Sequence, residues 1–185
     1  GLSVATTRSV IASGSYDNTV KLWSRTDEAD VLTLPHEGAV NDLAFSLDET
    51  YLVAGTDAGN VQLWDLRSEQ LAATIPSRDG RINSVAIDNR SSAIASGSSS
   101  GSLKIWPLTT DTSSLKMPIV LSKSGAQINS LVFHPIDSNL LISGNQKGVI
   151  QVWNISQGSV VTTLKESDEQ IVSIDISNDG QYVAT

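Results

Sequence analysis

Hydrophobic residues gather in short runs along the chain, and the runs recur about every forty residues. In four of these runs a Gly stands nine residues before a Trp, as Gly14/Trp23, Gly55/Trp64, Gly97/Trp106 and Gly144/Trp153. The four stretches read ASGSYDNTVKLW (12–23), AGTDAGNVQLW (54–64), ASGSSSGSLKIW (95–106) and ISGNQKGVIQVW (142–153). Successive Trp residues lie 41, 42 and 47 positions apart. Self-similarity at such a period indicates a repeat architecture.

Two further families of apolar runs keep the same period. One precedes the Gly and Trp, as AVNDLAF (39–45), RINSVAI (81–87), QINSLVF (127–133) and QIVSIDI (170–176). The other is DVLTL (30–34), LAATI (71–75), MPIVL (117–121) and SVVTTL (159–164). These runs are short, rich in Val, Ile, Leu and Thr, and bounded by Gly, Asn, Asp or Ser, which is typical of strands joined by turns. Short turns such as SLDE (46–49) favour antiparallel pairing.

Several of these strands are apolar on both faces, so each sheet must be covered on both sides. Val20, Leu22 and Trp23 stand together in one run, and Val61, Leu63 and Trp64 in the next. A sheet that is apolar on both faces needs a layer against each of them. Four-stranded antiparallel sheets stacked radially meet this need, and a β-propeller blade takes about 40–45 residues. No window of eleven or more residues carries a helical stripe, so the pattern predicts an all-β propeller.

The chain resembles the WD-repeat (WD40) family over essentially its whole length. In the unit that matches best, His36 lies 28 residues before Trp64, Val40 opens the first strand, Phe45 closes it, and Trp64-Asp65 ends the third. The resemblance implies structural roles for the four Trp and four Gly residues named above. It also implies that the Trp residues lie inside the blades.

The match to the WD-repeat pattern is incomplete at two polar positions. The family's His position holds Arg78, Ser124 and Ser167 in later units, and its turn Asp survives only as Asp17, with Ala58, Ser100 and Lys147 elsewhere. The family's buried network of His, Ser or Thr, Asp and Trp is therefore complete in no unit. We expect the blades to be stabilised mainly by apolar packing, with fewer buried hydrogen bonds between polar side chains.

The repeat boundaries predict four units and the opening of a fifth. The units are 1–34, 35–75, 76–121, 122–164 and a partial 165–185, all within a single propeller region. A seven-bladed propeller needs roughly 300 residues, so we expect an open arc of about four blades of such a ring. A closed four-bladed ring is the alternative. The Ser/Thr-rich connection at 107–118 is expected to be a surface insertion.

Composition narrows the classes of partner. Twelve Lys and Arg against 20 Asp and Glu give a net charge of −8, which argues against a general nucleic-acid or anionic-membrane binder. The absence of Cys excludes disulfides, thiolate nucleophiles and Cys-ligated metals. No apolar run approaches the ~18–20 residues needed to span a bilayer. With no leader pattern visible either, an intracellular, cytoplasmic protein without cofactor is expected.

Few residues carry recognisable chemistry. Of the two His residues, His36 matches the structural His of the repeat and His134 precedes Pro135 in a turn, and neither has a second His at ligand spacing. The DISNDG stretch (175–180) imitates the start of a calcium loop, but its repeat register predicts a turn between strands. GSSSGS (97–102) lacks the Lys-Ser/Thr of a phosphate loop. No metal site is expected.

Loops therefore become the candidate functional elements, because loops carry binding while the scaffold positions them. WD propellers use the face formed by two loop sets, which fall here at 35–39, 76–81, 122–127 and 165–170, and at 15–18, 56–59, 98–101 and 145–148. By that resemblance, the candidate partner contacts are Tyr16, Asp17, His36, Asp57, Arg78, Asp79, Arg81, Gln127, Gln146 and Lys147. The mixture of charges suits a peptide or protein partner.

The leading functional interpretation is a non-enzymatic scaffold that binds other proteins or peptides. The rival is a propeller enzyme with an active site in its central channel. The first strands offer such a site only a sparse set of side chains, Asn41, Asp42, Asn83, Asn129 and Asp175. A nucleic-acid-associated propeller is disfavoured by the net charge.

A finer resemblance concerns residues 94–114 together with SGNQKGVIQVWNISQG (143–158). These stretches are similar to the propeller of the γ-tubulin-complex targeting family, and the TTDTSS insertion adds most to the likeness. Proteins of that family are centrosomal and spindle adaptors for microtubule nucleation. The resemblance implies a γ-tubulin complex as partner and a location at the centrosome or spindle.

Overall fold

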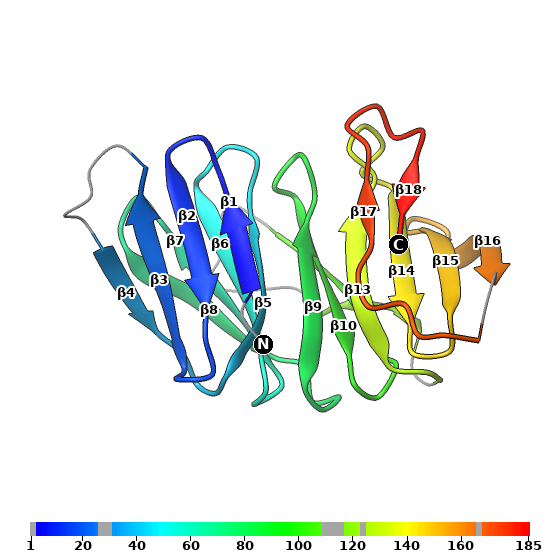
Figure 1. Cartoon of the computed structure of the whole chain (residues 1–185), viewed down its shortest axis with the longest axis horizontal. Coiled ribbons are helices and arrows are strands. Elements are labelled where there is room, and N and C mark those ends of the chain that lie inside the picture. The colour runs from blue at the N-terminus through cyan, green and yellow to red at the C-terminus, as the bar shows by residue number, and fades with distance from the viewer. Residues whose placement is uncertain (1–2, 26–30, 109–116, 123–124, 166–167) are drawn as a thin grey trace.

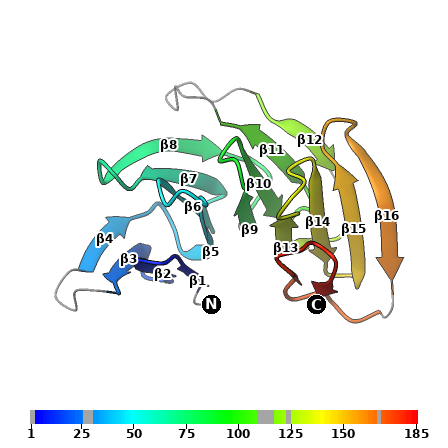
Figure 2. The same ribbon diagram turned by 90° about the horizontal axis from the view of Figure 1, so that it is seen from above.

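The fold is an arc of four antiparallel blades followed by a short hairpin (Figures 1 and 2). The computed structural model describes residues 3–25, 31–108, 117–122, 125–165 and 168–185. Within each four-stranded sheet, neighbouring strands in space are also neighbours in sequence. The prediction of an all-β fold built from four-stranded propeller blades is therefore confirmed. In the part of the chain that the structure describes, no helix is long and apolar enough to cross a membrane. Of the predicted surface insertion at 107–118, residues 109–116 lie outside the described residues.

Every blade runs from an inner strand to an outer one, with β1, β5, β9 and β13 on the inside of the arc (Figure 2). The strands are β1 Ser3–Thr6, β2 Val10–Gly14, β3 Thr19–Ser24 and β4 Val31–Pro35 in blade 1; β5 Val40–Phe45, β6 Tyr51–Thr56, β7 Asn60–Asp65 and β8 Gln70–Pro76 in blade 2; β9 Ile82–Ile87, β10 Ala93–Ser98, β11 Leu103–Pro107 and β12 Ile119–Ser122 in blade 3; β13 Ile128–Phe133, β14 Leu140–Asn145, β15 Val149–Asn154 and β16 Ser159–Lys165 in blade 4; and the final hairpin β17 Asp175–Ile176 and β18 Val183–Ala184.

The repeated glycines allow adjacent blades to approach closely. A Cβ atom added at any of these four glycines would lie no more than 2.6 Å from a γ-carbon of the β-branched residue that begins the next blade's inner segment. The pairs are Gly14 with Val40, Gly55 with Ile82, Gly97 with Ile128 and Gly144 with Ile171. Val40 and Ile82 are completely buried as a result. Glycine is therefore required for the space it leaves, since all four have ordinary backbone angles.

Three of the four Trp residues fill the junction with the preceding blade. Trp64 packs in one cluster with Leu22 and Leu34 of blade 1, and Trp106 packs in another with Val61 and Ile75 of blade 2. Trp153 likewise joins the apolar residues of blade 3. Each of these three side chains is only 6% exposed. The predicted interior position is correct for these blades.

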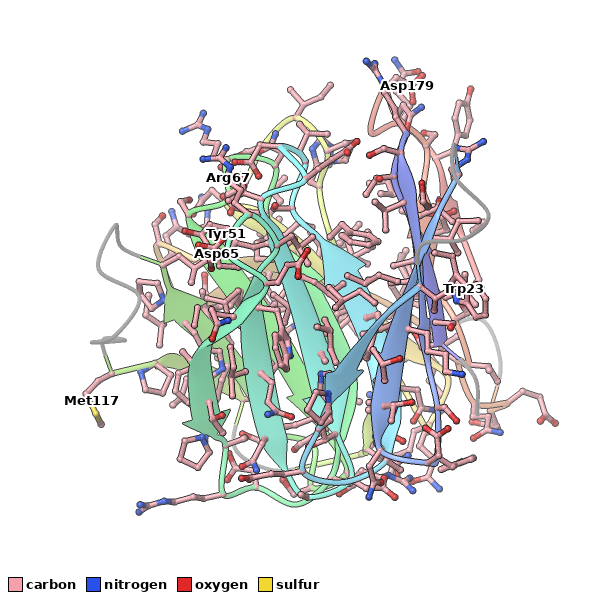
Figure 3. The ribbon with its side chains drawn as sticks, turned by 90° about the vertical axis from the view of Figure 1, so that its left-hand side faces the viewer. Trp23, Tyr51, Asp65, Arg67, Met117 and Asp179 are labelled. Carbon is pink, nitrogen blue, oxygen red and sulfur yellow. The ribbon has the colours of Figure 1, made fainter. Side chains whose placement is uncertain are left out.

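Trp23 departs from that prediction because no described element packs against it. It lies on the side of blade 1 that faces away from blade 2 and is 42% exposed (Figure 3). In register with it across the sheet lie Ile11 and Val31, and Val31 is also exposed. No described element packs on this face of blade 1, so the indole that is interior elsewhere is partly exposed here.

The Trp side chains form more hydrogen bonds through their indole N–H groups than the sequence suggested. Ser13, Ser96 and Ser143, each ten residues before its Trp, accept the indole N–H at 2.9–3.0 Å. The equivalent position in blade 2 is Ala54, and there the indole of Trp64 donates to Nε2 of His36 at 3.1 Å instead. Each indole N–H thus has an acceptor, and the expectation of blades held mainly by packing stays a prediction. A missing hydroxyl in one blade is replaced by an imidazole, because a buried N–H without an acceptor costs stability.

The inner strands of adjacent blades are joined by side chains, because their backbones do not form ladders with one another. Asn41, Asn83 and Asn129 occupy equivalent positions, and each donates its amide to a backbone carbonyl of the next blade's inner segment at 2.7–2.8 Å. One position further on, Ser84 and Ser130 each accept a backbone N–H from the next blade through the hydroxyl. These contacts fix the rotation of one blade relative to the next.

Asp42 takes the place of that Ser between blades 2 and 3. Its carboxylate accepts hydrogen bonds from the Val85 N–H at 2.9 Å and the Ser84 hydroxyl at 2.8 Å. The Leu43 N–H and the Ser3 hydroxyl also donate to it. Burial raises the pKa of Asp42 above its usual value, although these donors partly oppose the shift.

The glycine contact predicts non-additive stability changes. Gly55→Ala should destabilise the fold by about 1–3 kcal/mol because the new methyl group clashes with Ile82. Ile82→Ala should cost about 2–5 kcal/mol through the cavity it leaves. The double variant should cost less than the sum, since each change provides the space that the other needs. Urea unfolding of all four proteins measures the coupling, and costs that add within ~0.5 kcal/mol would contradict the steric explanation.

The buried carboxyl predicts a pH dependence of stability. Because folding raises the pKa of Asp42, its contribution is present at low pH and is lost as the pH rises through the folded-state pKa. The unfolding free energy of wild type relative to Asp42→Ser should therefore fall as the pH rises from about 4 towards neutrality. Asp17→Ser is the control, because hydrogen bonding from Thr19 lowers the pKa of Asp17. The unfolding free energy of wild type relative to Asp17→Ser should therefore rise, not fall, as the pH rises. A pH-independent difference for Asp42→Ser would rule out the buried-carboxyl account.

Candidate partner-binding face

Two sets of connections meet at one end of the blades, along the lower edge in Figure 1. One set joins an outer strand to the next blade's inner strand, and the other joins the second and third strands of a blade. Backbone hydrogen bonds of 2.9 Å connect the sets, from Asp57 to Ala39, from Ser99 to Arg81 and from Gln146 to Gln127. We call this end of the molecule the loop face. The structure thus brings together the two loop sets that sequence analysis singled out.

His36 does not belong to the exposed part of this face. Its imidazole is buried, with Nε2 accepting from Trp64 and Nδ1 lying 3.0 Å from the carbonyl of Leu34. Nδ1 therefore carries the proton, and burial lowers the pKa of the ring. The expectation that His36 contacts a partner is corrected, because both ring nitrogens are occupied inside the blade.

Arg81 and Asp57 form an ordered pair across the junction of blades 2 and 3. The guanidinium Nε lies 3.7 Å from Oδ1 of Asp57 and donates to Oδ1 of Asn83 at 2.9 Å. The same oxygen of Asp57 accepts from the amide of Asn41 at 2.8 Å. Asn41 and Asn83 were considered from sequence only as channel-lining residues. In the structure they also hold the two charged side chains in place.

Asp79 is held by a cation that sequence analysis did not single out. Lys104, from β11, forms an ion pair with Asp79 and donates to the carbonyl of Ser77 at 2.6 Å. Burial alone would raise the pKa of Asp79, but the hydrogen bonds from Lys104 and Ser102 outweigh it and keep the pKa below its usual value. The available signal was a lone charged residue, Lys104, inside an otherwise apolar run between Leu103 and Ile105.

Four of the candidate residues are exposed and unpaired. Tyr16 is 66% exposed, and no described residue bonds to its side chain or to those of Arg78, Gln146 and Lys147. Arg78 has a positive φ of 61° and is exposed on the β8–β9 connection. Gln127 is partly buried, and its amide donates to Asn129 at 3.0 Å. The side chains available to a partner are therefore fewer than the sequence suggested.

Asp17 remains charged at the edge of the face. Its carboxylate accepts from the Thr19 hydroxyl at 2.6 Å and from the Thr19 N–H at 3.0 Å. These hydrogen bonds, the hydroxyl first, lower the pKa of Asp17. The turn therefore presents a fixed negative charge above blade 1.

The opposite end of the blades contains a hollow of about 370 Å³ between blades 1 and 2, lined by apolar and polar residues in equal number. Leu22, Phe45 and Leu66 line it, and Glu49 and Glu69 lie at its rim. Val10 also lines it, where the equivalent residue in blade 2 is the larger Tyr51, which is packed against the next junction.

The remaining polar candidates form structural contacts. Within the described ranges, no group of three or more His, Cys, Asp or Glu is placed to hold a metal ion. In the DISNDG stretch, Asp179 accepts from the Ser177 hydroxyl at 2.6 Å and from the Gln181 N–H, as the carboxylate of a turn does. Nδ1 of His134 caps its own turn by accepting the backbone N–H of Asp137 at 3.0 Å.

Sequence comparison places the chain among WD-repeat proteins. It is 28% identical over 174 residues to the WD repeat-containing protein 91 homolog of Dictyostelium discoideum, covering 92% of this chain and 23% of that protein. It is 25% identical over 176 residues to the target of rapamycin complex subunit LST8 of Bos taurus, covering 95% and 53%. The chain thus spans about half or less of the length of the curated relatives it matches.

Structural comparison agrees on the fold. The β-propeller domain of Cps50 (Swd1) from Myceliophteria thermophila superposes with a TM-score of 0.86 over 97% of this chain and 60% of that one, at 18% identity. The finer resemblance to the γ-tubulin-complex targeting family finds no support, and its TTDTSS insertion lies outside the described residues. The family described as "Nucleolar protein 10-like, N-terminal domain" matches residues 11–185. The chain therefore belongs to this family of WD40-type β-propellers.

Proposed function

We propose that the chain is a non-enzymatic scaffold that binds partner proteins or peptides through the loop face. The observation that carries the proposal is the contrast within that face. Tyr16 and Arg78 project without partners, whereas the residues beneath them are fixed by hydrogen bonds and ion pairs. Exposed Tyr and Arg side chains on a rigid support are the types that dominate protein interfaces.

The membership of LST8 in a complex is consistent with such a role, since its description names it a subunit of the target of rapamycin complex. A central-channel enzyme is less compatible with the contacts of the inner strands. Asn41, Asn83 and Asn129 are committed to joining blades, and Asp42 already accepts two backbone N–H groups. No observation favours a γ-tubulin complex as partner, and the intracellular, cytoplasmic location stays a prediction.

The loop face is tested by comparing affinity capture by the full-length protein and its variants. Tyr16→Ala with Arg78→Glu should reduce recovery of direct partners by about tenfold or more, because two such interface side chains together supply more than ~1.4 kcal/mol of binding free energy. Arg81 is left unchanged, since replacing it would also disturb Asp57 and Asn83. Quantitative mass spectrometry measures the recovery.

The control variant carries Arg67→Glu and Arg90→Glu. Both arginines are exposed and lie on turns at the opposite end of the blades, where Figure 3 shows Arg67 at the upper edge. Recovery with this control should match wild type. Undiminished recovery with the loop-face variant, or an equal loss with the control, would exclude the loop face as the binding surface.

A further inference from the structure

The charges of the loop face are neutralised unequally. Arg81 is paired with Asp57, and Lys104 with Asp79, so these four contribute no net charge. Among the described residues, four other charged groups of the face form no ion pair. Asp17 is hydrogen-bonded to neutral groups, and Lys21 of β3 acts on it only as the smallest of the interactions that lower its pKa. Glu37 accepts from the amide of Asn60 at 3.2 Å. Arg78 and Lys147 have no side-chain partner among the described residues.

The uncompensated charges are separated along the arc. Asp17 lies on the β2–β3 turn of blade 1 and Glu37 on the connection from blade 1 to blade 2; the two segments are joined by a 2.8 Å hydrogen bond from the His36 N–H to the Asn18 carbonyl. Arg78 lies on the connection from blade 2 to blade 3, and Lys147 on the β14–β15 turn of blade 4. Figure 2 shows that these blades follow one another around the arc. Among the described residues, the charges without an ion-pair partner are therefore negative over blade 1 and its connection to blade 2, and positive at Arg78 and Lys147.

Backbone contacts hold these charged loops in position. The Ser77 N–H beside Arg78 bonds to Gly59 of the neighbouring turn at 3.0 Å, and Oδ1 of Asn145 accepts the N–H of Lys147 at 2.9 Å. Beyond blade 4, Lys165 and Asp168 form an ion pair at 2.6 Å, and Glu169 also has an interaction within the protein. The positions of the two charged halves are thus set by the blades.

We propose that the loop face recognises an extended protein segment with a basic block and an acidic block, laid along the arc. The basic block lies over Asp17 and Glu37, and the acidic block over Arg78 and Lys147. The proposal rests on the proposed function and adds the chemistry of its partner. Complementary charges of this kind set orientation and reject wrong partners, because like charges brought together are costly. A nucleic acid does not fit, since its uniform negative charge opposes the first half.

The test uses fluorescence anisotropy of the full-length protein with three labelled peptides of equal length at about 50 mM salt, where exposed charges are weakly screened. One peptide carries a Lys block and a Glu block, one only Lys and one only Glu. Wild type should bind the mixed peptide about three- to tenfold more tightly than either single-sign peptide, the range expected for two exposed charge contacts. A single-sign peptide bound as tightly would overturn the proposal.

Charge reversal provides the sharper comparison. Arg78→Glu with Lys147→Glu should abolish the preference for the mixed peptide and favour the Lys peptide, and Asp17→Lys with Glu37→Lys should favour the Glu peptide. The protein with all four changes keeps the net charge of wild type. It should again prefer the mixed peptide, which then binds with its Lys and Glu blocks exchanged between the two halves of the arc. Arg67→Glu with Arg90→Glu matches the net charge of the first variant and should leave the preference intact.

The outcomes separate this proposal from the proposed function. Three results would each overturn the proposed order of charges. The two double variants could keep the wild-type peptide preference, the Arg67/Arg90 control could change that preference as much as they do, or the fourfold variant could fail to bind the mixed peptide. Partner capture that is lost with Tyr16→Ala but is indifferent to the charge reversals would leave the loop face as a binding surface without this specificity. Circular dichroism and melting temperature verify that every variant is folded.

Discussion

The arc depends on one steric constraint, which is that a glycine in the second strand of each blade receives the first β-branched side chain of the next. The clearance at Gly14, Gly55, Gly97 and Gly144 leaves no room for a methyl group. Close approach at this point lets the inner strands exchange side-chain hydrogen bonds and lets three of the Trp side chains close the outer part of the junction. Protein interiors tolerate little change in volume, so this contact sets the spacing and rotation of the blades.

The same junctions between blades hold the connections of the loop face in fixed positions. Its loops are short and bonded to one another, so charged side chains far apart in sequence are held at fixed positions. Asn41 illustrates the link, because its amide bonds both to the next blade and to Asp57 on the face. A scaffold built this way can separate charges along a surface without rearranging, which suits recognition more than catalysis.

Sequence reasoning reached the blade architecture because the relevant signals are local and repeated. Short apolar runs, turn residues and the Gly–Trp spacing each report on a few neighbouring residues, and four copies reinforce one another. It failed where a residue's surroundings come from another blade. Trp23 has the same local sequence as its counterparts and is nevertheless exposed. His36 was expected both as the structural His of the repeat and as a partner contact, and its burial against Trp64 agrees with the first role alone.

The sequence by itself determined the strands, the blade as repeating unit, and which connections form the loop face. Only the tertiary structure decided which charged groups on that face are neutralised and which stay available. Arg78 and Arg81 look equivalent in sequence, yet Arg81 is bound to Asp57 and Asn83 while Arg78 has no partner among the described residues. The physical reason is that ion pairs and hydrogen bonds join residues such as Asp79 and Lys104, 25 positions apart, whose approach depends on how the strands are registered in space.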